Sequence, residues 1–399
     1  MKLSLTVVPP PREAPGAPPE SVQVSEPMLR FRCNQKGCCC SGWDIPFRLE
    51  DFMRLHEHLP ESERTELTHG INLVLDAKSE ENGDRILHSL KLDGVGENRA
   101  CRFLSGEGAC GVHARHGLQA LPDLCVDFPA FGYRRADDRV ELWFDPVCPE
   151  VLERLDESDE PLRLHLQRGA FGDEGLDLRV AHTANRIGGR LGKTTLEPAA
   201  LDRIRATAVE AFAAPRPAWR TLASLLHAFR RLRIGNAGAF EVVEPEDPQP
   251  FLKFLADCVA SHGADLLSAT LHRYRRFIWS IDPAPLLAGA VAGHLEYWQP
   301  AFAQWLAPQE DLLQPLASRW LAHRFGMPMV SGRGELREAA DSIVQLYGTS
   351  LRLAAAYGAV LQRPVDRSIY KAAIGTAEFF YRSLRLPRDA LPWFASARD

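Results

Sequence analysis

The sequence of 399 residues contains no uncharged apolar run that approaches the ~20 residues a membrane-spanning helix requires. Its best candidate, residues 283–293, is far too short. The apolar run at residues 3–8 is broken by prolines, whereas a secretory signal needs ~7–15 apolar residues and a small-residue cleavage site. We therefore expect no membrane partner and a soluble protein located in the cytoplasm.

The sequence also lacks an excess of positive charge, because Lys and Arg number 47 against 52 Asp and Glu, for a net charge of −5. A general nucleic-acid binder needs a basic surface, so we expect no nucleic-acid partner. Basic and aromatic residues do alternate at 229–233 and 272–277, and we interpret both stretches as solvated helix faces. Hydrophobic residues make up 45% and charged residues 25%, which is ordinary globular composition and excludes wholesale disorder and fibrous folds.

No nucleotide-binding motif is complete in this sequence. The strand, Gly-rich turn and later acidic residue of a Rossmann-type methyltransferase are not evident. Residues 188–194 resemble a phosphate loop but place three residues between the glycines where the motif has four, so we expect a helix end there. The regularly paired cysteines of zinc fingers and ferredoxins are missing as well.

Cysteine is what the sequence does contain: there are nine, and eight of them lie between residues 33 and 148. In a reducing cytosol such clustering indicates metal or redox chemistry more than a disulfide framework. Thiolates are soft ligands that suit zinc, Cu(I) and iron–sulfur clusters. Eight could fill two four-ligand sites, or one site with spare buried thiols. The predicted metal ligands are Cys33, Cys38, Cys39, Cys40, Cys101, Cys110, Cys125 and Cys148.

Two other interpretations of these cysteines stay open. The eight could be small buried hydrophobes, or a set of stress-labile disulfides. The ninth, Cys258, follows Phe251, Phe254 and Leu255 on one apolar face of a predicted helix, and we expect it to be a core residue rather than a ligand.

The pattern of the chain changes along its length, and we predict a mainly α protein. A small, irregular α+β cysteine-cluster domain would pack on an all-α helical C-terminal domain. The predicted parts are a Pro-rich flexible leader at 1–25, the metal-binding domain at 26–155, a connecting segment at 156–196 and the helical domain at 197–399.

Local periodicity predicts the elements within these parts. Short strands are expected over 85–92 and 140–144, and short helices over 51–59 and 113–118. Apolar residues at helical spacing predict further helices over 219–233, 250–261, 265–279, 286–298, 311–325, 335–361 and 366–384.

The spacing of the cysteines and their neighbours resembles a known family. The pattern runs F-x-C-x5-C-C-x-G-W from Phe31, then C-x-F-L and C-x-V-H, then L-P-x-x-C-x-x-F-P, and ends at C-P-E with Glu150. It resembles the bacterial cysteine-cluster proteins, which are described as zinc- or iron-chelating. Within that set it is most similar to the flagellin lysine-N-methylase family, whose chains join a Cys-rich N-terminal part to a helical C-terminal part.

The resemblance implies an iron–sulfur cluster, [4Fe–4S] in type, and S-adenosylmethionine-dependent methylation of lysine side chains on a flagellin-like or other protein. By position, seven of the eight clustered cysteines match the family pattern. Cys38 is an additional thiol, and Lys36 stands where one common version of the motif has a cysteine. Glu378 and Arg382 are the nearest candidates for the Arg and Glu-His of the family's last helix.

Lysine methylation requires a deprotonated amine, in-line geometry and exclusion of water, but no catalytic residue can be assigned from these residues. Tyr133, Trp143 and Trp43 could hold a methylated ammonium by cation–π contact, although we prefer to interpret them as core aromatics. Two further functions stay open. The chain could be a metal-binding protein without catalysis, its helical half serving as an interaction module, or a thiol redox sensor.

Overall fold

The computed structural model describes residues 21–32, 45–47, 49–69, 71–75, 88–92, 101–105, 108–122, 125–126, 128–168, 189–261, 294–295, 298–327 and 335–383. The chain divides into two compact units. The first unit comprises residues 1–20, 35–128 and 169–183, and the second unit comprises 21–34, 129–168 and 184–399. We describe each unit by itself.

The first unit contains a three-stranded antiparallel sheet in the order β2-β4-β3. Its strands are β2 (Ile45–Phe47), β3 (Ile71–Leu75) and β4 (His88–Leu92), and its helices are α1 (Leu49–His58), α2 (Glu61–His69), α3 (Gly111–His116) and the 3-10 turn η4 (Leu118–Ala120). The helix predicted over 51–59 is confirmed by α1 to within two residues at each end. The helix predicted over 113–118 instead ends at His116, because Gly117 adopts a φ of +76° that few other residues tolerate.

The second unit is organised on a four-stranded sheet in the order β5-β6-β1-β7. Its strands are β1 (Ser21–Ser25), β5 (Ala130–Arg134), β6 (Val140–Phe144) and β7 (Leu164–Arg168). Strand β1 runs parallel to β6 and antiparallel to β7, while β5 and β6 form an antiparallel hairpin. All five residues of β6 are buried, which confirms the strand predicted over 140–144.

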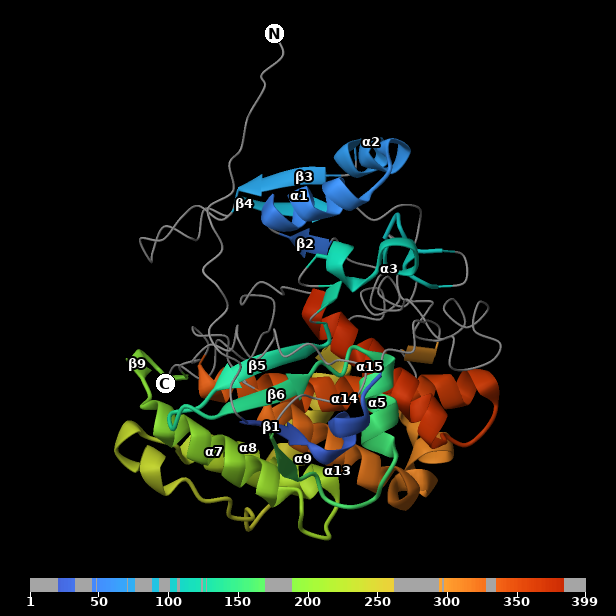
Figure 1. Ribbon diagram of the computed structural model, residues 1–399. Coiled ribbons are helices and arrows are strands. Elements are labelled where there is room, and N and C mark those ends of the chain that lie inside the picture. Colours follow the sequence, from blue (N-terminus) through green and yellow to red (C-terminus); the bar gives the residue numbers. More distant parts are fainter. Residues whose placement is uncertain are drawn as a thin grey trace. The chain divides into compact units, whose positions relative to one another are not determined.

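The rest of the second unit is helical, and the prediction of a mainly α protein is confirmed (Figure 1). Its main helices are α5 (Pro149–Asp156), α7 (Pro198–Ala211), α8 (Ala218–Arg231), α9 (Gln249–Ser261), α13 (Glu310–Gly326), α14 (Leu336–Leu361) and α15 (Arg367–Ser383). Shorter elements are η1 (Glu26–Arg30), β8 (Arg190–Leu191), β9 (Thr194–Thr195), η5 (Ile234–Ala239), α12 (Trp298–Ala301), the π-helical η8 (Phe302–Leu306) and η9 (Ala307–Gln309).

Five of the seven helices predicted in this half match described helices to within two residues, namely α8, α9, α13, α14 and α15. The predicted helix over 265–279 lies outside the described residues, as does most of the one over 286–298. Helix α14 is buried along most of its length, and it packs against α15, α9 and α8. Among the helices that the structure describes, none combines the length and apolarity needed to cross a membrane.

The two units divide the chain differently from the predicted boundaries. Strand β1 lies inside the predicted leader, and strands β7, β8 and β9 lie inside the predicted connecting segment. Val22 and Val24 of β1 are buried between two neighbouring strands. A strand this short is stabilised by pairing with residues far away in the sequence, so local composition around prolines does not reveal it.

Candidate metal centre

Three of the predicted ligands, Cys101, Cys110 and Cys125, pack against one hydrophobic cluster in the first unit. All three side chains are thiols of intermediate exposure. The cluster consists of Leu55, Leu59, Leu67, Phe103, Val112, Ala120 and Leu121. Thiols from three separate segments therefore share one small core, which is what a site closed by folding requires.

The segment from Cys101 to Cys110 folds back on itself. The amide of Leu104 donates to the carbonyl of Cys101 at 2.9 Å, and the amide of Gly111 donates to the carbonyl of Phe103 at 2.7 Å. Leu104 and Cys110 form an isolated antiparallel bridge. Because of this loop, the C-x-F-L and C-x-V-H motifs, separate in the sequence, are neighbours in space.

A turn that starts at Pro122 carries Cys125. The amides of Cys125 and Val126 donate to the carbonyl of Pro122 at 2.9 and 3.2 Å. The guanidinium of Arg54 on α1 donates to the carbonyl of Leu121 at 2.9 Å, which fixes this turn to the helix. The L-P-x-x-C motif thus has a local structural role, since its proline opens the turn that presents the thiol.

Thiols and imidazoles are the donor types that soft metals prefer, and α3 contains histidine in addition to the three cysteines of this region. The Nε2 atom of His116, on α3, is buried and has no hydrogen-bond partner in the described part of the chain. Within that same part, no group of three His, Cys, Asp or Glu side chains lies close enough to hold a metal ion. Cys33, Cys38, Cys39 and Cys40 lie outside the described residues.

Cys148 belongs to the second unit, where it is the N-cap residue of α5 and only 7% exposed. Its amide donates to the carbonyl of Asp145 at 3.0 Å, and the amide of Val147 donates to the Asp145 carboxylate at 3.0 Å. The ring centroids of Phe31 and Phe144 lie 5.1 Å apart. Phe31 precedes Cys33 by two residues, and Phe144 precedes Cys148 by four.

His323 of α13 binds the strand end that precedes Cys148. The Nε2 atom of His323 lies 2.6 Å from the carbonyl oxygen of Phe144, and this carbonyl can only accept a hydrogen bond. Burial lowers the pKa of His323 to about 4, so the imidazole is neutral at physiological pH. The proton therefore resides on Nε2, and the Nδ1 atom is a buried acceptor with no partner among the described residues.

Cys258 behaves as the sequence predicts. It is 1% exposed on α9, and burial raises the pKa of its thiol well above the ordinary value. A thiol held protonated is a poor nucleophile and a poor metal ligand. The structure supports the interpretation of Cys258 as a core residue.

Sequence reasoning missed a buried ion cluster at the centre of the second unit. The carboxylate of Glu141 on β6 accepts hydrogen bonds from Arg205 at 2.6 Å, from Arg135 at 2.7 Å and from the Trp143 indole at 2.7 Å. Burial by itself raises the pKa of Glu141, but the charge of Arg205 and these hydrogen bonds lower it below the ordinary value. The guanidinium of Arg205 also donates to the carbonyl of Gly326 at the end of α13, which joins the sheet to two helices.

Tyr133 and Trp143 take part in this cluster instead of facing a substrate. The Arg205 guanidinium lies 4.1 Å from the centroid of the Tyr133 ring and 5.8 Å from that of Trp143. The Tyr133 hydroxyl donates to Asp202 at 2.9 Å. Both aromatic residues are almost fully buried, so their cation–π partner is Arg205, and the core interpretation holds for them. Trp43 lies outside the described residues.

Glu378 is likewise internal. It is 2% exposed, accepts a hydrogen bond from the Trp320 indole at 2.7 Å and lies 3.4 Å from the guanidinium of Arg324. Burial raises the pKa of Glu378, although Arg324 and the indole oppose that rise. The side chain of Arg382, also on α15, lies outside the described part of the chain.

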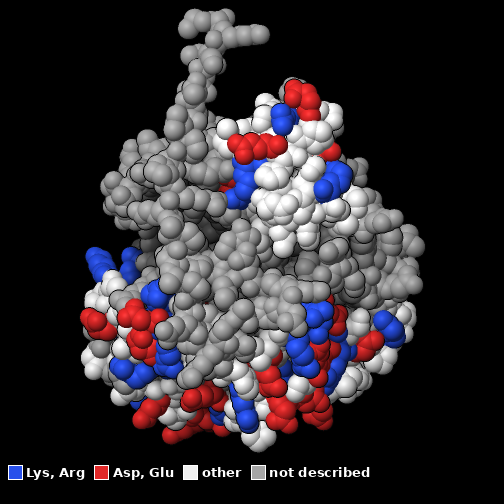
Figure 2. Space-filling view, in the orientation of Figure 1, with Lys and Arg blue, Asp and Glu red and all other residues white. Residues whose placement is uncertain are grey.

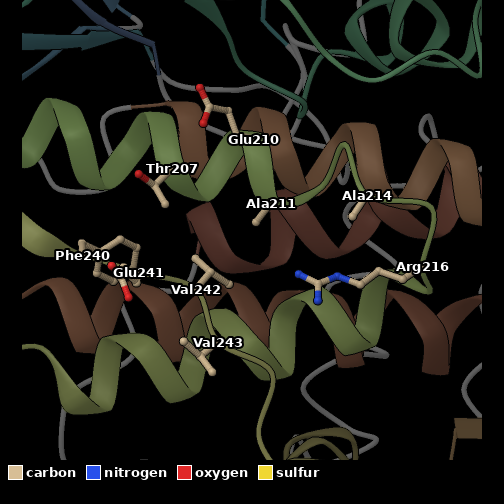
Figure 3. A pocket seen from close by; sticks show the side chains of 9 residues that line it. All are labelled: Thr207, Glu210, Ala211, Ala214, Arg216, Phe240, Glu241, Val242 and Val243. Atoms are coloured by element: carbon tan, nitrogen blue, oxygen red, sulfur yellow. The ribbon is translucent and has the colours of Figure 1, made fainter.

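A shallow hollow of about 490 Å³ opens beside the end of α7 (Figure 3). Figure 3 shows the guanidinium of Arg216 pointing into it, next to Val242. The lining residues are Thr207, Glu210, Ala211, Ala214, Arg216, Phe240, Glu241, Val242 and Val243, with no cysteine or histidine among them. This hollow therefore supplies no soft ligand.

A scan of the chain against protein-family models finds no match. Searches of curated proteins and of solved structures find no match either. Any functional assignment consequently depends on the residues themselves and on the resemblance of the cysteine motifs.

Proposed function

We propose that the chain binds an iron–sulfur cluster or zinc through thiolates of its clustered cysteines. The observation that carries this proposal is the packing of Cys101, Cys110 and Cys125 around one hydrophobic cluster. These three soft donors come from a loop, a helix start and a turn, and in the proposal metal binding draws them together with a fourth ligand. In the proposal one of Cys38, Cys39 and Cys40 completes the shell in the first unit, and Cys33 and Cys148 serve as further ligands.

Methyl transfer is the second part of the proposal, and the motif resemblance supports it. The chain would methylate lysine side chains of a flagellin-like or other protein, with S-adenosylmethionine as the methyl donor. Transfer of a methyl group to an amine changes no oxidation state, so a bound cluster or zinc ion would supply structural organisation. On the face drawn in Figure 2, acidic and basic side chains of the described residues are intermixed, which suits a protein partner better than a nucleic acid.

A metal-binding protein without catalysis is the alternative that the geometry supports. Methyl transfer needs a site that excludes water, yet the hollow beside α7 is open. In this alternative the helices of the second unit serve as an interaction module.

The metal proposal is tested by anaerobic purification, metal analysis and a visible absorption spectrum. Serine replacement of Cys101, Cys110 or Cys125 should each abolish metal loading. Serine replacement of Cys258 is the matched control, because it alters a buried cysteine of the helical core and should leave the metal content unchanged. Full metal content in the Cys101→Ser, Cys110→Ser and Cys125→Ser proteins would contradict the proposal.

The enzyme proposal is tested separately by calorimetry of the metal-loaded protein with S-adenosylmethionine. We expect saturable binding at one site per chain. A metal-loaded protein that releases no heat on titration would favour the non-catalytic alternative.

A further inference from the structure

The turn that joins β6 to α5 is fixed at both of its ends. The amide of Asp145 donates to the carbonyl of Pro129 at 2.8 Å, which extends the β5–β6 hairpin by one pair. The amides of Val147 and Cys148 both return to Asp145, at 3.0 Å each, and close the turn immediately before α5. The Cys148 thiol is therefore presented by a short, rigid segment and not by a loose loop.

Phe144 is paired with Ala130 across the β5–β6 hairpin, but in the described part of the chain the β1 side of β6 has no paired strand residue at this position. The parallel pairing of β6 with β1 ends at Leu142, two residues earlier. Beyond that point a side chain from a different element, His323 of α13, donates to the Phe144 carbonyl at 2.6 Å. The His323 ring also lies against Trp143, with centroids 5.2 Å apart and an angle of 63° between the planes. The imidazole of His323 thus packs against the Trp143 ring and donates its hydrogen bond to the next residue of the strand, Phe144.

We propose that His323 is a positioning residue for Cys148, because its hydrogen bond to Phe144 holds the turn that presents the thiol at the start of α5. The metal role of Cys148 rests on the proposed function. The effect of His323 on the geometry of the turn does not depend on that function. His323 need not contact the thiol. It binds Phe144, four residues before Cys148, and acts through the backbone between them.

The experiment compares three variants. His323→Leu removes the donor, whereas His323→Gln retains a donor at a place close to that of Nε2. Trp320→Phe is the matched control, because Trp320 lies on the same helix, is equally buried, and makes one buried hydrogen bond of 2.7 Å to Glu378. Should His323→Leu fail to fold, His323→Phe retains a ring against Trp143 and equally lacks the donor.

The readout is the rate at which iodoacetamide alkylates each cysteine of the metal-free protein, followed by mass spectrometry of the peptides. Cys258 reports unfolding of the second unit as a whole, because it is 1% exposed in the helical core. We expect His323→Leu to raise the ratio of Cys148 to Cys258 alkylation roughly tenfold, the effect of losing one buried hydrogen bond and leaving a carbonyl unpaired. His323→Gln should return the ratio to within about twofold of the parent value.

An unchanged ratio in His323→Leu, or an equal rise in Trp320→Phe, would overturn the inference. So would a His323→Gln protein that behaves like His323→Leu. Metal content of the parent protein is measured alongside. A parent that takes up no metal refutes the proposed function, while the alkylation ratio still decides whether His323 positions Cys148.

Discussion

The two units are stabilised in different ways. In the first unit, the seven residues of the hydrophobic cluster are surrounded by half-buried thiols and by loops held through backbone hydrogen bonds. In the second unit, a sheet and long helices enclose large aromatic residues and a buried ion cluster around Arg205. A small core rarely stabilises a fold without a metal or disulfide, whereas a large one does so by itself. We therefore expect metal binding to contribute more to the stability of the first unit, where Cys101, Cys110 and Cys125 lie, than to that of the second unit.

Removing the metal from the loaded protein should have the largest effect. For small metal domains the free energy of binding is free energy of folding, so the first unit should unfold when a chelator strips the metal. Hydrogen exchange would then show loss of protection across α1 and α2 and retained protection across α14 and α15. Equal protection in both units after metal removal would contradict the contrast between them.

Replacing Arg205 with Met should destabilise the second unit by about 3–5 kcal/mol, because Glu141 would stay buried without its main counter-charge. Arg203→Met is the matched control: Arg203 lies on the same helix but is exposed, so its loss should cost less than about 1 kcal/mol. Urea unfolding followed by tryptophan fluorescence measures both. Similar midpoints for the two variants would mean that the ion cluster contributes little.

Replacing Gly326 with Ala should destabilise the second unit by about 1–3 kcal/mol, because the added methyl group would overlap the Trp143 ring. Gly235→Ala serves as the control, since a Cβ at that position meets nothing within 4 Å. Thermal unfolding of the two proteins should differ clearly. A Gly326→Ala protein as stable as Gly235→Ala would show that the sheet can move away from α13 at little cost.

The smallest effect concerns pH and Asp341 on α14. Burial raises the pKa of Asp341 from 3.8 to about 6, with Glu335 and Glu338 contributing and Arg230 opposing the rise. The folded protein thus binds this proton more tightly than the unfolded chain does. The contribution of Asp341 to the free energy of unfolding is therefore most favourable below pH 3.8, the ordinary pKa. It falls as the pH rises from there toward about 6.

Asp341→Asn should accordingly be more stable than the parent at neutral pH, by about 1–2 kcal/mol, with the difference vanishing near pH 4. Urea unfolding at a series of pH values measures this difference. Asp257→Asn is the control, because Asp257 is an exposed residue of α9 whose pairing with Lys253 is on the surface. A parallel pH profile for both variants would exclude Asp341 as the source of the dependence.

Much of the fold could be predicted from local pattern. The apolar spacing of 335–361 and 366–384 predicts α14 and α15 to within one residue at each end, because helix periodicity is contained in neighbouring residues. The interpretation of Cys258 followed from the same kind of pattern. The boundaries of the units could not be found in this way, since β1 is a strand only through pairing with β6 and β7.

The candidate site shows the same division. The concentration of thiols before residue 149 and the resemblance of their spacing to one family can be found without a structure, because residue type and spacing are local properties. The contacts of Cys101, Cys110 and Cys125 with one core, and of His323 with the strand before Cys148, follow from the folded chain. The same is true of the cation–π contacts that Arg205 makes with Tyr133 and Trp143. These contacts join residues distant in the chain, and folding creates them by burying polar groups that must then find partners.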